Sequence, residues 1–412
     1  MSRNGTFRQV FSSREYRALW TATLLSDVGD QLARVAVAVI AYERTSSAAV
    51  TAVTYALTFV PALIGGPLLG GLADRFPRRE VMFCCDLVRA VLAGLMALPG
   101  TPLAVLCALL FAVHLLEAPV RASYSAVLPQ VLDGDGYVTG LSALQMASQA
   151  VRVLGFAVGG VVAAVFRPEN ALLMDAATFL AAALIVRFGL TARPAPRPPV
   201  RAPAPGTPSS PGSRGVATVR MIAGDRRLRL LVASAWLAGF YVTPQALALP
   251  YAAALGMGGA GAGVLMAAGP LGALAGVLVL GRMVPAPARL ALLGPLTVLT
   301  SVPLILVATG PGPAGSVALL ALSGLCSAYQ VTANAEFVTG VPDHLRGRAV
   351  GLAGSGLIAA QGLGMAAGGL LAELTGPGTA ITTAGVLGTL AALPLATAWH
   401  TRVHSLRRLR HG

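Results

Sequence analysis

Ten ionisable side chains lie in stretches of sequence that are otherwise apolar, and they are the residues of this chain best suited to chemistry. A charged side chain at the centre of a bilayer costs about 2.5–3.5 kcal/mol on an insertion scale, so each is a functional candidate by default. Carboxyl and guanidinium groups held close together in such surroundings can form ion pairs or exchange protons. The ten residues are Asp27, Asp30, Arg34, Asp86, Arg89, Glu117, Arg121, Arg152, Asp175 and Glu336.

Asp30 is the candidate best placed for proton chemistry. It lies near the middle of its apolar stretch, and Arg34, four residues later, shares a helical face with it. Burial favours the neutral carboxyl and a nearby arginine favours the carboxylate, so Asp30 could exchange a proton as its surroundings open and close. A permanently paired structural charge is the alternative. The residues predicted to couple protons or to bind substrate are Asp27, Asp30, Arg34, Arg152 and Glu336.

Two further acid–base pairs have helical spacing. Asp86 and Arg89 are three residues apart and Glu117 and Arg121 are four apart, so each pair can meet on one helix face. Both pairs fall toward the predicted cytoplasmic ends of their helices, which favours a gate or a structural ion pair over a substrate ligand. Asp175, near the predicted outer start of its helix, is interpreted as a favourable charge at a helix N-terminus.

The composition indicates that the elements carrying these residues are membrane helices. Of 412 residues, 55% are hydrophobic and only 11% charged, with a mean hydropathy of +0.73, whereas a soluble domain carries roughly 25% charge. A soluble enzyme, a disordered chain and a disulfide scaffold are excluded. The four cysteines fall in apolar runs without metal-ligand spacing, and the histidines of the basic tail form no credible metal cage, so we expect neither metal nor cofactor.

Apolar runs of about 20 residues predict an all-α integral membrane protein with twelve transmembrane helices. The predicted ranges are 18–42, 49–73, 80–98, 102–124, 138–165, 171–189, 228–254, 258–283, 288–309, 314–340, 347–373 and 377–399.

The distribution of arginine supports this layout and predicts its orientation. All 30 basic residues are arginine, and most fall in the two termini, the even-numbered loops and the central linker. Arginine gathers on the cytoplasmic side of membrane proteins, so both termini are predicted to be cytoplasmic. The net charge of +14 therefore follows topology and anionic lipid, and we expect no nucleic-acid partner.

A Pro-, Ser- and Arg-rich segment divides the chain nearly in half. We predict a six-helix bundle over 1–190, a cytoplasmic linker over 191–226, and a second bundle with a basic tail over 227–412. Related glycine patterns in the fifth and eleventh ranges favour duplication of a six-helix unit and close helix packing. The glycines concerned are Gly155, Gly159, Gly160, Gly364, Gly368 and Gly369.

The loop between the second and third ranges reads Gly-Gly-Leu-Ala-Asp-Arg-Phe-Pro-Arg-Arg over residues 70–79. Charges at the point where two helices leave the membrane can form contacts that break when one bundle moves against another. A basic turn that only sets topology is the alternative. The residues of this predicted latch are Gly70, Asp74, Arg75, Arg78 and Arg79.

The same loop resembles the signature loop of the major facilitator superfamily, where it is a conformational latch. The resemblance covers essentially the whole chain and implies two pseudo-symmetric six-helix bundles around a central cavity. Three segments, 24–30, 86–89 and 119–129, look like the drug-proton antiporter branch that includes macrolide and enterobactin exporters. The helix beginning near residue 138 departs from the antiporter motif of that branch, because Val151 and Phe156 replace a glycine and a proline.

Taken together, the residues and the resemblance predict a secondary active transporter that exports a small amphipathic compound in exchange for protons. We expect a monomer in the cell membrane, with the lipid bilayer, protons and a small-molecule substrate as its partners. An importer or facilitator of the same fold is one alternative. A polytopic membrane enzyme is another, but the polar residues are scattered and form no acidic metal motif or nucleophile with its base.

Overall fold

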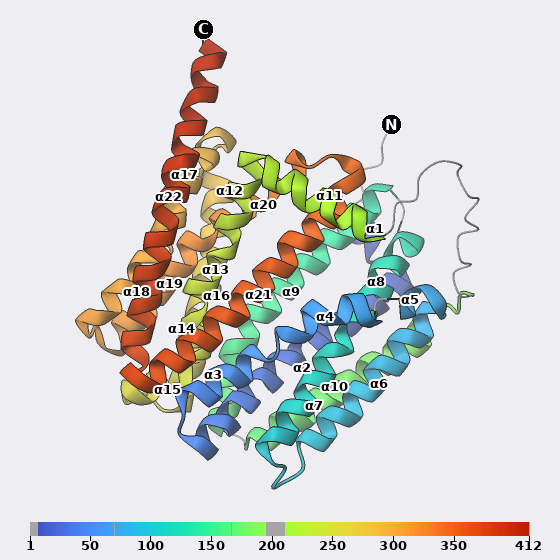
Figure 1. Ribbon diagram of the computed structural model, residues 1–412. Coiled ribbons are helices and arrows are strands. Elements are labelled where there is room, and N and C mark those ends of the chain that lie inside the picture. The colour runs from blue at the N-terminus through green and yellow to red at the C-terminus, as the bar shows by residue number, and fades with distance from the viewer. Residues whose placement is uncertain (1–6, 70, 133, 166, 195–210, 412) are drawn as a thin grey trace. The chain divides into compact units, whose positions relative to one another are not determined.

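Helices make up all the regular secondary structure of the described residues (Figure 1). The computed structural model describes residues 7–411 except 70, 133, 166 and 195–210. Across that part of the chain every predicted range is occupied by helix and no strand occurs. The expectation of an all-α protein is therefore confirmed.

Eight helices of the described residues are long and apolar enough to cross a membrane. A ninth span results if Arg226–Ala246 and Ala248–Ala254, which are bent by 48°, are counted as one. The described chain is thus that of a multi-pass membrane protein, and the number twelve stays a prediction.

The chain divides into two compact units. Unit 1 comprises Met1–Ser46 and Leu57–Arg201, and unit 2 comprises Ser47–Ala56 and Ala202–Gly412. This division differs from the predicted ranges at two places. Ten residues from the first half of the chain, Ser47–Ala56, pack with the second half, and the predicted linker 191–226 is divided between the units and contains a helix over Pro211–Gly224.

The helices of unit 1 place the ionisable residues. They are α1 (Phe7–Val10), α2 (Arg14–Thr45), α4 (Val60–Leu69), α5 (Leu72–Arg75), α6 (Arg78–Met96), α7 (Leu103–Leu115), α8 (Glu117–Val131), α9 (Gly134–Val165) and α10 (Pro168–Gly189).

Helix α2 is central to unit 1, because it packs along α10 and α9, and α10 in turn packs along α6. One apolar cluster between α2, α6, α7 and α10 includes Leu32, Met96, Leu110 and Phe179. These helices therefore enclose the middle of α2, where Asp30 lies.

The first helices of unit 2, those before Gly259, are short. The helices of this unit are α3 (Ala48–Ala56), α11 (Pro211–Gly224), α12 (Arg226–Trp236), α13 (Ala238–Tyr241), α14 (Thr243–Ala246), α15 (Ala248–Ala254), α16 (Gly259–Met283), α17 (Ala286–Leu299), α18 (Val302–Ile305), the 3₁₀ helix η1 (Leu306–Thr309), α19 (Gly312–Ser327), α20 (Tyr329–Gly340), α21 (Asp343–Thr375) and α22 (Pro377–His411).

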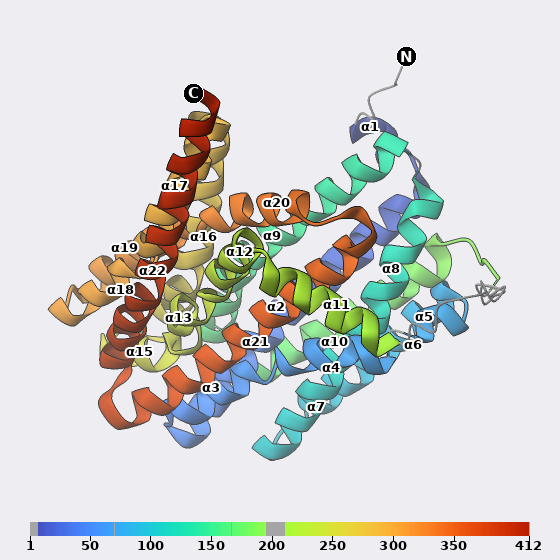
Figure 2. The same ribbon diagram turned by 45° about the horizontal axis from the view of Figure 1, so that its top comes forward.

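The second predicted span is shared between the units. Its first half, α3, packs along α21 in unit 2 (Figure 2), whereas α4 packs against α7 and α8 in unit 1. Glu373 near the end of α21 accepts hydrogen bonds from the Ser47 hydroxyl (2.8 Å) and the Ala49 amide (3.1 Å) at the start of α3. The carboxylate thereby satisfies amide groups that the first turn of a helix leaves unpaired.

Local sequence explains the main helix boundaries. Ser13 caps α2 by accepting a hydrogen bond from the Tyr16 amide, and Asp225 caps α12 through the Arg227 amide. The break between α7 and α8 at Leu116 precedes Pro119, whose ring nitrogen cannot donate to the carbonyl of Leu115.

Candidate functional site

The interior of unit 1 contains an ion-pair network built from α2 and α6. One guanidinium nitrogen of Arg89, Nη2, donates to both carboxylate oxygens of Asp30 at 3.1 Å. The other, Nη1, donates to Oδ1 of Asp86 at 3.2 Å. Arg89 is 1% exposed, Asp86 2% and Asp30 6%, so all three charges are out of reach of bulk solvent.

The sequence positions this network through helical spacing and an aromatic support. Asp86 and Arg89 lie three residues apart on α6, which brings both to the face that meets α2. The Arg89 guanidinium carbon lies 3.9 Å from the ring centroid of Phe179 on α10, a cation–π arrangement. Two carboxylates therefore share the guanidinium of Arg89, which packs on an aromatic ring from a third helix, α10.

Asp175 brings a third carboxyl to this region from α10. It is 1% exposed, and its Oδ1 is buried without a hydrogen-bond partner. The interpretation of Asp175 as a charge at a helix N-terminus is wrong, since α10 begins at Pro168 and its first turn holds Glu169 instead. The missed signal was periodicity, because Asp175 falls in the same buried stripe as Leu172 and Phe179.

A second polar cluster lies around Arg121. Its guanidinium is hydrogen-bonded to Glu117 one turn earlier on α8 and lies 3.9 Å from the Asp27 carboxylate on α2. The Ser148 hydroxyl on α9 donates to Asp27 at 2.6 Å. The side chain of Arg121 is 63% exposed, so this cluster is far more open than the one around Arg89.

The side chain of Arg34 contacts His114. Its Nε donates to Nε2 of His114 at 3.4 Å, while Nδ1 of that ring lies 3.1 Å from the Leu110 carbonyl. A neutral imidazole with its proton on Nδ1 satisfies both contacts. The ion-pair partner of Asp30 is thus Arg89 from another helix, and not the arginine one turn along its own.

Other predicted coupling residues lie apart from the Arg89 network. Glu336 on α20 forms an ion pair with Arg227 at the start of α12 in unit 2, where the two side chains are 25% and 30% exposed. Arg152 lies on α9, but its side chain is outside the described residues.

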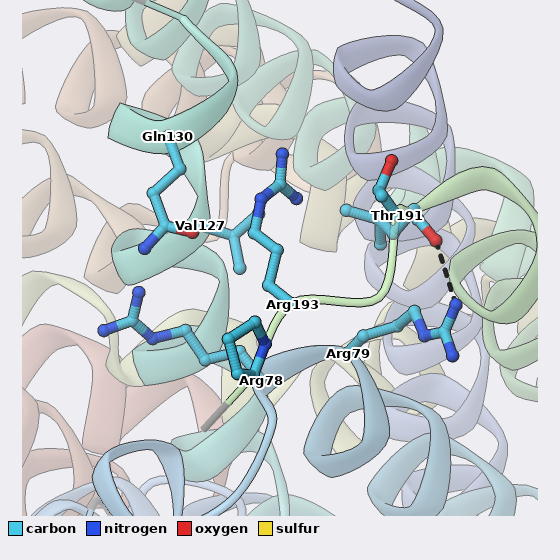
Figure 3. A pocket seen from close by; sticks show the side chains of 8 residues that line it. Arg78, Arg79, Val127, Gln130, Thr191 and Arg193 are labelled. Atoms are coloured by element: carbon cyan, nitrogen blue, oxygen red, sulfur yellow. Dashed lines mark hydrogen bonds between the residues drawn. The ribbon is translucent and has the colours of Figure 1, made fainter. Parts of the chain in front are cut away.

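Two of the predicted latch residues, Arg78 and Arg79, line a small pocket of unit 1 (Figure 3). Arg78 donates to the Ala126 carbonyl at 2.9 Å, and Arg79 donates to the Leu190 carbonyl at 3.2 Å and to Glu80 at 2.9 Å. Arg75 is exposed, while Gly70 and the side chain of Asp74 lie outside the description. The pocket lining comprises Arg78, Arg79, Val127, Gln130, Leu190, Thr191, Arg193 and Pro194.

The predicted packing glycines lie at close helix contacts wherever their surroundings are described. A Cβ on Gly155 would meet the Gln31 side chain at 2.8 Å, and one on Gly364 would overlap the Gly239 carbonyl. Gly368 abuts Thr243 and Gly369 abuts Ala52 in the same way. The surroundings of Gly159 and Gly160 are not described.

The described residues contain no group of three or more His, Cys, Asp or Glu side chains arranged to hold a metal ion. The carboxyl groups beside Arg89 can pair with its charge and can bind protons.

Comparison with known proteins identifies the family. Residues 19–340 match the profile of the Major Facilitator Superfamily. The chain belongs to this superfamily. It is thus a multi-pass membrane transporter, since its superfamily is one of transporters.

A curated relative of this superfamily member is the uncharacterized MFS-type transporter YkuC of Bacillus subtilis (strain 168), 24% identical over 183 residues. That match covers 43% of this chain and 42% of YkuC, so it spans less than half of the relative's length.

Solved structures share the superfamily fold over nearly the whole chain. A mutant of the nucleoside transporter NupG is 15% identical with a TM-score of 0.69, covering 94% of this chain and 99% of NupG. A POT family transporter in complex with 5-aminolevulinic acid is 11% identical with a TM-score of 0.73, covering 97% and 98%. A bacterial homologue of the iron transporter ferroportin, in an inward-facing state, is 14% identical with a TM-score of 0.64, covering 93% and 98%.

Proposed function

We propose that this superfamily member is a proton-coupled exporter of a small amphipathic compound. The observation that carries the proposal is the buried network of Asp30, Asp86 and Arg89 in unit 1. Charges inside a membrane protein are costly and face interior pathways in transporters, which favours a working role over a packing role.

The balance of charge around Arg89 supports proton coupling. Asp30, Asp86 and Asp175 are all buried, and Arg89 is the one buried arginine among the described residues. If all three carboxyls were ionised, the region would carry excess negative charge in a medium of low dielectric. Because such excess charge is strongly unfavourable, at least one carboxyl binds a proton there.

Proton binding can drive transport through differential affinity. A conformation that buries the carboxyls favours the protonated form, and one that hydrates them favours release. A substrate that prefers the second conformation then moves against its gradient while protons move down theirs. We propose that this cycle alternates the access of a site between two six-helix bundles, 1–190 and 227–412, joined by the linker 191–226.

The outward direction and the substrate class rest on the resemblance of segments 24–30, 86–89 and 119–129 to the drug-proton antiporter branch. Side chains of unit 2 offer apolar and aromatic surface of the kind that amphipathic compounds bind. Trp236 is 41% exposed and donates to the Ala353 carbonyl, while Tyr241 is hydrogen-bonded to Gln330. We further propose a monomer in the cell membrane with both termini in the cytoplasm.

Vesicles with a fluorescent proton reporter test the proposal. The protein would be studied in inside-out membrane vesicles with an acidic interior, to which macrolides, hydrophobic cations and siderophores are added in turn. Coupled export predicts that at least one compound enters the vesicles and accelerates proton release from the interior. Uptake of a compound without any proton movement would instead favour the facilitator, to which the departures at Val151 and Phe156 point.

A further inference from the structure

Asp175 of α10 is the buried carboxyl whose contacts least suit a negative charge. Asp30 and Asp86 each receive direct hydrogen bonds from Arg89, but Oδ1 of Asp175 is buried without any partner. A buried ionised oxygen without a hydrogen bond costs so much that such a group ordinarily takes up a proton instead.

The position of Oδ1 is fixed by a close approach of α10 to α2. A Cβ on Gly29 would overlap both Oδ1 of Asp175 and Oγ1 of Thr178, so glycine creates the space in which these two oxygens lie. The only hydroxyl proton of Thr178 is donated to the backbone carbonyl of Asp175 at 2.7 Å. Oγ1 therefore has lone pairs for a neighbouring proton, but no proton to give to a carboxylate.

The charged groups facing Asp175 come from α2 and α6, the two helices that pack most extensively along α10. Asp30 and Arg34 approach from α2, and Arg89 approaches from α6 with Asp86 beside it. The positive groups already have partners, since Arg89 binds Asp30 and Asp86, and Arg34 donates to His114. Ionisation of Asp175 would thus add a further negative charge to a region whose cations are already engaged.

We propose that Asp175 holds the exchangeable proton, while Asp30 and Asp86 serve as the fixed hydrogen-bond partners of Arg89. The step is the reversible reaction of one carboxylate with one proton, whose source and destination are water on the two sides of the membrane. This assignment rests on the proposed proton coupling and names the group that performs it.

Arg89 also offers a way for proton loss to change the structure. Its Nε is buried and lacks a hydrogen-bond partner, and its guanidinium lies over Phe179, one helical turn from Asp175 on α10. Once deprotonated, Asp175 competes with Asp30 for this guanidinium. Release of the proton would therefore weaken the contact between α2 and α6.

Infrared spectroscopy of the full-length protein in lipid nanodiscs tests the assignment without any substrate. The protein would be labelled with ¹³C at the aspartate carboxyl, so that the carbonyl stretch of a protonated aspartic acid shifts relative to that of a glutamic acid. Wild type is expected to show a label-sensitive band of protonated aspartic acid at pH 7. We expect this band to be lost in Asp175→Asn and retained in Asp27→Asn, because Asp27 contacts Arg121 and Ser148 and its removal leaves Arg89 bound to Asp30 and Asp86.

Glu169→Gln is the matched control, because it makes the same acid-to-amide change in the first turn of the same helix and should leave the band intact. Gly29→Ala keeps the carboxyl but forces Oδ1 away from its position, so the band should move in frequency. This second variant tests the site even if Asp175→Asn fails to fold. A full band in Asp175→Asn, or an unshifted band in folded Gly29→Ala, would overturn the assignment.

The vesicle assay separates this inference from the proposed function. If no compound moves protons through the wild type but the infrared band depends on Asp175, the proposed proton coupling is wrong and the protonation of Asp175 is still supported. If substrate movement is coupled to proton movement equally well in the wild type and in Asp175→Asn, the assignment of the proton to Asp175 is wrong and the proposed function is still supported.

Discussion

The two units of this transporter bury different kinds of polar group. Every acidic, arginine or histidine side chain that is buried among the described residues, namely Asp30, Asp86, Arg89, His114 and Asp175, belongs to unit 1. The buried polar side chains described in unit 2 are serines and threonines, and buried tyrosines add further hydroxyl groups. Carboxyl and imidazole groups respond to protons and to the opening of a cavity, whereas hydroxyl groups do not titrate in the physiological range. The proposed proton coupling therefore has groups that titrate near neutral pH in the interior of unit 1, whereas the described interior of unit 2 offers hydroxyl groups.

Neutral hydrogen bonds and close backbone contacts hold unit 2 together. The Tyr329 hydroxyl donates to the Ser234 carbonyl at 2.6 Å, and the hydroxyl groups of Tyr251 and Ser316 lie 2.7 Å apart. Helices α16 and α19 approach so closely that a Cβ on Gly272 would overlap the Ala321 carbonyl. Small residues of this kind let membrane helices gain packing energy without charge.

The largest expected effect comes from removing the shared cation of unit 1. Arg89→Met leaves Asp30 and Asp86 buried without their partner, and breaking such a pair costs about 3–5 kcal/mol. The free energy of unfolding in detergent should fall by this amount. Adding Asp30→Asn and Asp86→Asn to the same protein should recover most of the loss. The control is Arg167→Met, at an exposed arginine preceding α10. If Arg89→Met lowers the free energy of unfolding no more than this control does, the ion pairs of Arg89 do not stabilise the protein.

In unit 2 the comparable change is steric. Gly272→Ala places a methyl group against the Ala321 backbone, and overpacking of this kind costs about 1–3 kcal/mol. The matched control is Gly269→Ala on the same helix, where a Cβ would meet no atom within 4 Å. Thermal unfolding should separate the two variants. Equal unfolding temperatures would show that α16 and α19 do not depend on their close approach.

A smaller effect is expected at the partly exposed ion pair of unit 2. Because the side chains of Glu336 and Arg227 are 25% and 30% exposed, their pairing should contribute less than about 1 kcal/mol. A double-mutant cycle with Glu336→Gln and Arg227→Gln measures it. A coupling energy as large as the loss in Arg89→Met would remove the contrast between the units and would favour Glu336 as a proton-coupling residue.

The smallest effect should appear at low pH, where Glu15 joins the start of α2 to Arg193. Partial burial acts to raise the pKa of Glu15, but hydrogen bonds from Arg193 and Thr191 outweigh it and lower that pKa. Its contribution to stability is therefore complete above its ordinary value of about 4.3 and is lost as pH falls through the lower folded value. The stability difference between wild type and Glu15→Gln should shrink only in that acidic range. A difference that already declines between pH 7 and 5 would contradict this.

The helices of this protein were largely predictable because apolar runs of membrane length leave a strong signal. Asp30, Asp86 and Arg89 could likewise be singled out as ionisable residues in such runs. The partner of Asp30 could not, since Arg34 has the right spacing on one helix whereas Arg89 reaches Asp30 through packing of α6 against it. The burial of Asp175 could have been predicted from its helical spacing with Leu172 and Phe179, but its contact with Gly29 depends on the packing of α10 against another helix, which spacing along one helix does not reveal.

The packing of α3 against α21 has a consequence for dissection of the chain. Residues 202–412 expressed alone would lack a helix that belongs to their own fold, since Ser47–Ala56 comes from the other half of the gene product. Such a fragment needs complementation, either by the co-expressed segment 1–201 or by a peptide carrying α3. Conversely, if the chain is cleaved in the linker, the first piece still carries α3. Its packing against α21 of the second piece would keep the two pieces associated, as an exchanged element does in a domain-swapped dimer.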